Sequence, residues 1–97
     1  MAKIKINSGE YVYEIVGYLF TAKIGDRRHR FAYSSNKDGS MNITHVKSGL
    51  RFAEASTSQI NAALGNRKSV AIRAIAARIE GKNPDEVNAK LDAAPEI

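Results

Sequence analysis

Apolar and polar residues alternate with a period of two through the first half of the chain, a pattern typical of β-strands. The alternation covers residues 3–7, and residues 10–16 are rich in aromatic and β-branched side chains. After Gly17 the alternation resumes over residues 18–24. Because a glycine inside so long a run favours a bulge or a bend, we predict that this strand curves and lets the sheet curl toward a small barrel.

Short polar segments separate the strands that follow. Gly25-Asp26 predicts a tight hairpin turn with glycine at a positive φ angle. Residues 34–40 predict a polar loop, and Ser48-Gly49 predicts a further turn. Because each connection is too short to hold a crossover helix, we predict an antiparallel meander of about four to five strands over residues 1–55.

Beyond residue 55 the period changes, and the sequence predicts helices. Residues 56–58 offer candidate N-caps for a short helix that ends near Gly65-Asn66. Asn83-Pro84 and the two acidic residues after it predict the start of a last helix. The segment 67–80 between them has helical periodicity and places on one face Ala71, Ile72, Ile75, Ala76 and Ile79.

Together these elements predict an α+β fold. A curved β-meander in residues 1–55 is followed by two to three helices in residues 56–97 that pack on it. A chain of 97 residues is expected to form a single domain, here residues 1–97. Its 43% apolar and 26% charged residues are ordinary for a globular protein.

Composition excludes some classes of site and sets the expected compartment. The chain contains no cysteine, which excludes disulfides, thiolate metal sites and a cysteine nucleophile. No apolar run approaches the roughly 20 residues of a membrane span, and the N-terminal segment lacks the apolar core of a signal peptide. We therefore expect a cytoplasmic protein that does not associate with membranes.

Positive charge is concentrated in two regions of the chain, whose formal net charge is +5. Residues 25–51 hold six Lys/Arg against two acidic residues, and residues 66–82 hold five against one. Residues 83–97 reverse the sign, with four acidic residues against one lysine. A basic body of this kind favours an anionic partner, such as nucleic acid or an acidic protein surface.

The predicted β-hairpin around Gly25-Asp26 is the main candidate for contact with nucleic acid. The planar fork of arginine binds phosphate through two hydrogen bonds, and a two-stranded ribbon can enter a major groove. The alternative is that these arginines only keep a turn solvated. The predicted nucleic-acid-binding residues are Arg27, Arg28 and Arg30, extended by Lys37, Lys47 and Arg51.

Four aromatic side chains near this hairpin have two interpretations. Tyr18, His29, Phe31 and Tyr33 could stack on unpaired bases. The alternative is that Phe31 and Tyr33 form the core, which we favour because the arginines already occupy the opposite face of the strand.

The helix predicted over residues 67–80 carries a second candidate surface. With its isoleucines turned to the core, its outward strip is small and apolar, framed by arginines, as is typical of protein interfaces. The alternative is that the last helix covers this strip. The predicted partner-binding residues are Arg67, Val70, Arg73, Ala74, Ala77 and Arg78.

Catalytic chemistry has little support in the sequence. His29 and His45 lie on neighbouring predicted strands and, with Lys47, could cleave RNA without a metal. We instead expect one histidine at the edge of the core and the other exposed. Two histidines without further ligands do not make a metal site, and no glycine-rich phosphate loop is present, so we expect no metal and no cofactor.

Three functions are thus ranked. The first is a non-enzymatic module that contacts the phosphate backbone of DNA or RNA independently of sequence. The second is a small protein-binding effector or inhibitor, of the kind found as accessory proteins of phages and mobile elements, that docks on a nucleic-acid-processing enzyme. A metal-independent endoribonuclease is a distant third. A homodimer is compatible with any of them.

Overall fold

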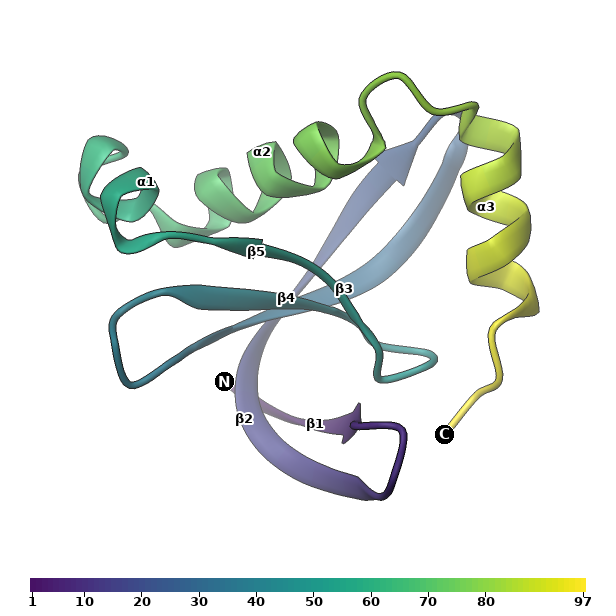
Figure 1. Cartoon of the computed structure of the whole chain (residues 1–97), viewed down its shortest axis with the longest axis horizontal. Coiled ribbons are helices and arrows are strands. Elements are labelled where there is room, and N and C mark those ends of the chain that lie inside the picture. The colour runs from purple at the N-terminus through teal and green to yellow at the C-terminus, as the bar shows by residue number, and fades with distance from the viewer.

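Five antiparallel strands are followed by three helices in the computed structural model, which describes all residues 1–97 (Figure 1). The order of the strands in the sheet is their order in the chain, so the predicted α+β meander is confirmed. The sheet is curled but is not closed into a barrel. The strands are β1 (Ala2–Asn7), β2 (Val12–Ile24), β3 (Arg27–Ser35), β4 (Met41–His45) and β5 (Arg51–Ala55). The helices are α1 (Thr57–Ala62), α2 (Arg67–Ile79) and α3 (Pro84–Ala93).

The long strand β2 changes partner at Gly17, where the sequence predicts a bend. Its first half pairs with β1, ending with Ala2 opposite Gly17, and its second half pairs with β3 from Tyr18 onward. A Cβ atom on Gly17 would lie 3.1 Å from both the Ile4 side chain and the Tyr33 carbonyl oxygen. The missing side chain therefore lets β1 approach the sheet closely as β2 curves (Figure 1).

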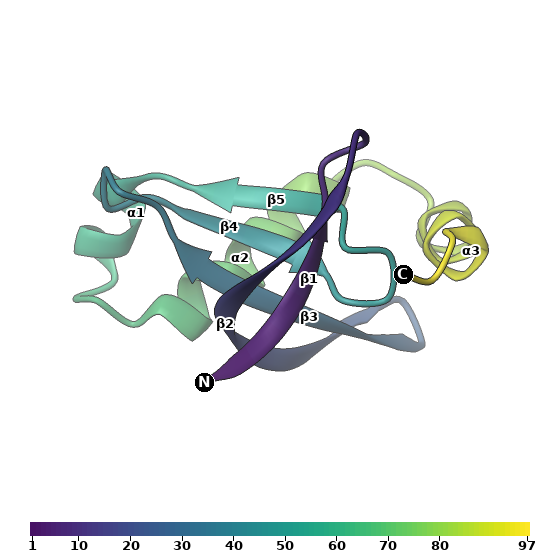
Figure 2. The ribbon, with the colours of Figure 1, turned by 90° about the horizontal axis from the view of Figure 1, so that it is seen from below.

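Both faces of the sheet are covered, one by α2 and the other by β1 with the first half of β2 (Figure 2). Ile6 and Ile15 line a cavity opposite Ser34 and Thr44, which places the β1–β2 hairpin over that face. The sheet does not close, because β1 forms no strand pair with the β4–β5 turn that it approaches. There, the Asn7 N–H donates to the Gly49 carbonyl at 2.9 Å.

The main hydrophobic core lies between the sheet and α2. Phe31, Met41 and Ile43 are fully buried on the strands, and Ala71 and Ile75 meet them from α2. Burial of such side chains stabilises the fold by about 25 cal/mol per Å² of apolar surface. This core holds in place the sheet that carries many of the basic side chains.

The predicted orientation of α2 is wrong by about one residue position around the helix. Val70, predicted to face outward, is only 4% exposed, whereas Ile72, predicted to be core, is 43% exposed. Ala71, Ile75 and Ile79 face the core as predicted. Val70 and Ala74 join them in place of Ile72 and Ala76, which are exposed.

Capping residues set the helix starts, and the sequence predicts those of α1 and α3 but not Asn66 of α2. Ser56 and Gln59 form a capping box on α1. Asn66 caps α2 by accepting from the Ser69 N–H, and Asn83 caps α3 by accepting from the Asp85 N–H. None of the three helices has the length and apolarity needed to span a membrane.

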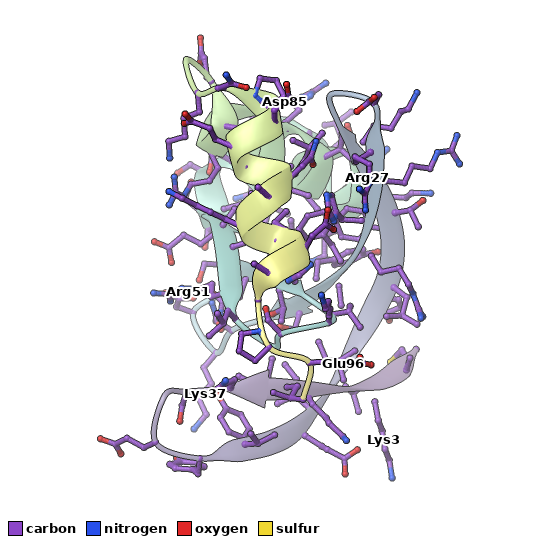
Figure 3. The ribbon with its side chains drawn as sticks, turned by 90° about the vertical axis from the view of Figure 1, so that its right-hand side faces the viewer. Lys3, Arg27, Lys37, Arg51, Asp85 and Glu96 are labelled. Carbon is purple, nitrogen blue, oxygen red and sulfur yellow. The ribbon has the colours of Figure 1, made fainter.

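The last helix, α3, lies beside the β2–β3 hairpin (Figure 3), and its Val87 and Leu91 line a small cavity together with Ile79 of α2. Asn88 on α3 is buried, and its Nδ2 donates to the Ile24 carbonyl at 2.9 Å. The segment after α3 then returns to the β4–β5 turn, where the Ile97 N–H donates to the Lys47 carbonyl at 3.1 Å. This path makes the C-terminal segment one wall of a cleft.

Candidate nucleic-acid interface

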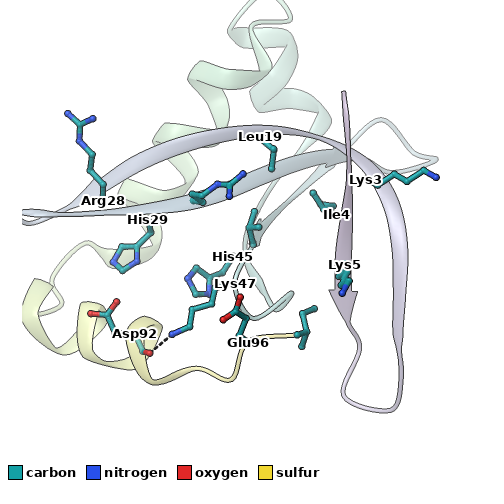
Figure 4. A pocket seen from close by; sticks show the side chains of 13 residues that line it. Lys3, Ile4, Lys5, Leu19, Arg28, His29, His45, Lys47, Asp92 and Glu96 are labelled. Atoms are coloured by element: carbon teal, nitrogen blue, oxygen red, sulfur yellow. Dashed lines mark hydrogen bonds between the residues drawn. The ribbon is translucent and has the colours of Figure 1, made fainter.

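A cleft of about 520 Å³ opens between β1, the first residues of β3, the β4–β5 turn and the C-terminal segment (Figure 4). Most of its charged side chains are cationic, and we call it the basic cleft. Two carboxylates, Asp92 and Glu96, stand against a larger set of cations. The cations that line the basic cleft are Lys3, Lys5, Arg28, Arg30 and Lys47.

Strand alternation places these cations. Lys3 and Lys5 flank the buried Ile4 on β1, and Arg28 and Arg30 flank the buried His29 on β3. The charged ends of Lys3 and Arg28 point outward at the rim, as Figure 4 shows. The cations thus reach solvent, where a ligand could meet them.

The cleft cations have no carboxylate partner in the protein. The two ion pairs of the structure join Arg27 to Asp92 at 3.1 Å and Arg51 to Glu54 at 3.7 Å, and neither uses a cleft cation. None of the five cleft cations is therefore ion-paired, and Lys47 has a backbone acceptor, since its Nζ donates to the carbonyl of Asp92. The unpaired charge in a concave site creates a positive potential that attracts anions.

The six residues predicted to bind nucleic acid are not one surface. Arg28, Arg30 and Lys47 line the basic cleft. Arg27 lies next to them but is paired with Asp92. The other two lie elsewhere, Lys37 in the β3–β4 turn and Arg51 at the start of β5 (Figure 3).

Lys3 and Lys5 were missed by the sequence reasoning. Their alternation with isoleucine indicates exposed lysines on a strand, but nothing in it indicates what lies opposite. The curl of the sheet at Gly17 brings β1 against the β4–β5 turn, as the bond from Asn7 to Gly49 records. A local pattern cannot report that juxtaposition.

Both histidines are buried, so the expectation that one would be exposed is wrong. His29 is 7% exposed and His45 is 3% exposed, with ring centroids 5.9 Å apart. The Nε2 of His29 donates to Asn88 Oδ1 at 2.8 Å, because the amide nitrogen of Asn88 is already used as a donor. The Nδ1 of His45 lies 2.9 Å from the Ser48 hydroxyl.

The pKa of His45 is lowered from its ordinary value of 6.5, first by burial and then by the nearby His29 and Lys47. Burial acts this way because it disfavours the charged imidazolium. The histidines thus hold α3 and the β4–β5 turn against the sheet and form the inner end of the basic cleft.

The favoured core interpretation is confirmed for Phe31, which is fully buried and packs against Phe52 at a ring-centroid distance of 5.3 Å. Tyr33 is partly buried and stacks on Tyr18 at 5.1 Å. No tyrosine or phenylalanine lines the basic cleft. Apart from the buried rings of His29 and His45 at its inner end, the lining of the cleft is ionic and aliphatic.

The predicted partner-binding strip is divided by the rotation of α2. Val70 is in the core, while Ala74, Ala77 and Arg78 line a second groove of about 510 Å³ beside β5. Ala77 is exposed, so the last helix does not cover it. Two of the predicted residues, Arg67 and Arg73, are exposed outside that groove.

No group of three or more His, Asp or Glu side chains is arranged to hold a metal ion. Comparison of the chain with protein-family models, with curated proteins and with solved structures gives no match. The fold therefore defines the class of this protein as an α+β chain, a five-stranded antiparallel meander followed by packed helices, and any function must be argued from its surface.

Proposed function

We propose that this protein is a non-enzymatic module that binds the phosphate backbone of DNA or RNA in the basic cleft, independently of base sequence. The observation that carries the proposal is that five cations line one cleft, although they come from β1, β3 and the β4–β5 turn, segments far apart in the sequence. Gathering like charges disfavours the compact state, and a bound polyanion relieves that repulsion.

The types of side chain in the basic cleft favour phosphate as the ligand group. Arg28 and Arg30 can each donate two hydrogen bonds to one phosphate, while the lysines act as point charges. Contacts to phosphate position a nucleic acid without reading its sequence. The lack of tyrosine and phenylalanine in the cleft argues in the same direction, because it removes the usual platform for unpaired bases.

Two carboxylates moderate the expected affinity. Asp92 and Glu96 face the same cleft as the five cations, so part of the positive potential is cancelled. We therefore expect binding that is strong at low salt and weakens steeply as salt rises, since released counterions supply the driving force.

The test is fluorescence anisotropy with labelled single- and double-stranded DNA and RNA of about 20 nucleotides, which offer more phosphates than the cleft can contact. The cleft variant carries Arg28→Ala, Arg30→Ala and Lys47→Ala. The matched control carries Lys37→Ala, Arg51→Ala and Arg73→Ala, three exposed cations outside the cleft. Each variant lowers the formal net charge of +5 by three.

We expect the cleft variant to lose at least about tenfold more affinity than the control, a difference of about 1.4 kcal/mol. Equal losses would show that bulk charge, and not the cleft, attracts the nucleic acid. No binding by the unmodified protein at low salt would end the proposal. Far-UV circular dichroism verifies that both variants are folded.

The same RNA samples separate binding from cleavage. We expect labelled RNA to remain intact after prolonged incubation, because His29 and His45 are buried and hydrogen-bonded within the fold. Cleavage that is lost in a His29→Ala variant would contradict the non-enzymatic assignment and favour the endoribonuclease alternative.

A further inference from the structure

The groove beside β5 is a second candidate site and is independent of the basic cleft. Its volume is about 510 Å³, and it shares no lining residue with the cleft. Phe52, Ala53, Ala74 and Ala77 give it an apolar floor. The two alanines on α2 are small, so a second backbone could approach α2 closely at this point.

The outer edge of β5 has no partner strand. β5 is the last strand of the sheet and pairs with β4 alone. No backbone hydrogen bond from a turn or loop reaches residues 51–55. Such an edge presents free N–H and C=O groups that can template an additional strand.

The register of β5 limits the length of an added strand. The β4–β5 ladder shifts beside Phe52, so that Thr44 pairs with Arg51 while Ile43 pairs with Ala53. The regular edge is therefore residues 53–55. An added strand would span about three to five residues, the usual length of a short edge pairing.

Charge around the groove is predominantly positive. Arg78 lines the groove. The carboxylate in the groove lining, Glu54, already pairs with Arg51 at 3.7 Å. A smaller cavity of about 120 Å³ continues from Phe52 and Arg78 toward α3, with Lys82 and Lys90 on its rim. The apolar lining of this smaller cavity is Phe52, Ile79, Val87 and Leu91.

We propose that β5 and α2 bind an extended acidic segment of a protein partner by strand addition. The partner backbone pairs with the free edge of β5. One aliphatic side chain of the partner enters the 120 Å³ cavity, a size below that of apolar cavities known to take a benzene ring. The carboxylates of the partner segment face Arg78, Lys82 and Lys90.

A second copy of the chain is a poorer occupant of this groove. Pairing of β5 with β5 would bring Arg78, Lys82 and Lys90 of both copies toward one interface, and like charges disfavour such an association. An acidic peptide instead neutralises this set. The inference therefore commits to a partner protein whose extended segment carries an aliphatic residue and an acidic residue two positions apart, because such residues share one face of a strand.

The experiment selects binders from a phage-displayed library of random heptapeptides on the immobilised protein, with the Ala77→Glu variant as counter-target. Ala77→Glu places a carboxylate in the groove. Ala76→Glu is the matched control, since Ala76 is exposed on the same helix, outside the groove, and the charge change is identical. The best peptide is then titrated against the ¹⁵N-labelled protein by NMR.

We expect enriched peptides to carry aliphatic and acidic residues two positions apart and to shift amide signals of residues 51–55 and 74–78. Affinity should fall at least about tenfold in Ala77→Glu and less than about twofold in Ala76→Glu. Failure to enrich any peptide, equal losses in the two variants, or shifts confined to the basic cleft would each overturn the proposal. A concentration-dependent dimer whose interface includes β5 would overturn it in favour of self-association.

Discussion

The number of phosphates that the basic cleft neutralises can be measured from the salt dependence of binding. Five Lys/Arg side chains line the cleft. For single-stranded nucleic acid, the slope of log K against log salt is about −0.7 per neutralised phosphate, so five contacts predict a slope of about −3.5. Between about 50 mM and about 200 mM salt, this slope corresponds to a loss of affinity of about 100-fold.

Removal of a single cation should change this slope by a known amount. Arg30→Ala deletes one of the five contacts and should bring the slope to about −2.8. Lys37→Ala removes the same charge from the β3–β4 turn, outside the cleft, and should leave the slope at its original value. Fluorescence anisotropy of a labelled thymidine oligonucleotide at four salt concentrations gives both slopes.

Two results would refute this reasoning. A slope near −1 for the unmodified protein would mean that about one phosphate is neutralised and that the cleft is not the binding surface. The same change of slope in Arg30→Ala and Lys37→Ala would mean that the position of a cation on the molecule does not affect nucleic-acid binding. In either case the clustering of the cations would have no functional meaning.

Three further predictions concern the fold that supports the basic cleft. Asn88→Ala removes two buried hydrogen bonds and leaves their partners unsatisfied, so urea denaturation should show a loss of about 1–3 kcal/mol. Gly49→Ala would place a Cβ atom 2.8 Å from a carbonyl of β1, whereas at Gly65, also at positive φ, a Cβ meets nothing within 4 Å. Gly65→Ala should therefore lose about 1–2 kcal/mol from the left-handed backbone alone, and Gly49→Ala clearly more, by thermal unfolding. The pKa of His45 is lowered from 6.5 by burial, so the unfolded chain binds this proton more tightly, and stability should be complete above 6.5 and decline as pH falls below it. Urea midpoints from about pH 7.5 to about pH 5.5 check this sign, and His45→Gln should flatten the decline, while an unchanged decline would contradict it.

Local chemistry explains why the sequence predicts most of the fold. The Gly25-Asp26 turn, the interruption at Gly17 and the Asn83-Pro84 helix start are each determined by neighbouring residues, and each is found in the structure. The rotation of α2 was not predictable in this way. Val70 and Ile72 are both apolar, and the local pattern does not decide which of them is buried.

The candidate site was predicted less completely, for a related reason. Arg28 and Arg30 were found because two-residue spacing on one strand is a local signal. Lys3 and Lys5 join them only through the curl of the sheet. From the sequence alone, the polar Asn88 would be placed on the exposed face of an amphipathic helix. Its burial depends on contacts with Ile24 and His29, about 60 residues away.

The topology also predicts how the molecule opens. Every strand pairs with its neighbour in sequence, so the sheet assembles by successive closure of short loops, which is fast. The last helix buries only Asn88 and Leu91. It is held mainly by polar contacts, in which Asn88 bonds to Ile24 and His29, and Asp92 bonds to Arg27 and Lys47. With so little buried surface, α3 should detach in local excursions that leave the sheet intact, and its amide protons should exchange well before those of β3 and β4. Because Asp92 lies on α3 and Glu96 follows it in the chain, each such excursion would briefly remove internal counter-charge from the cleft cations.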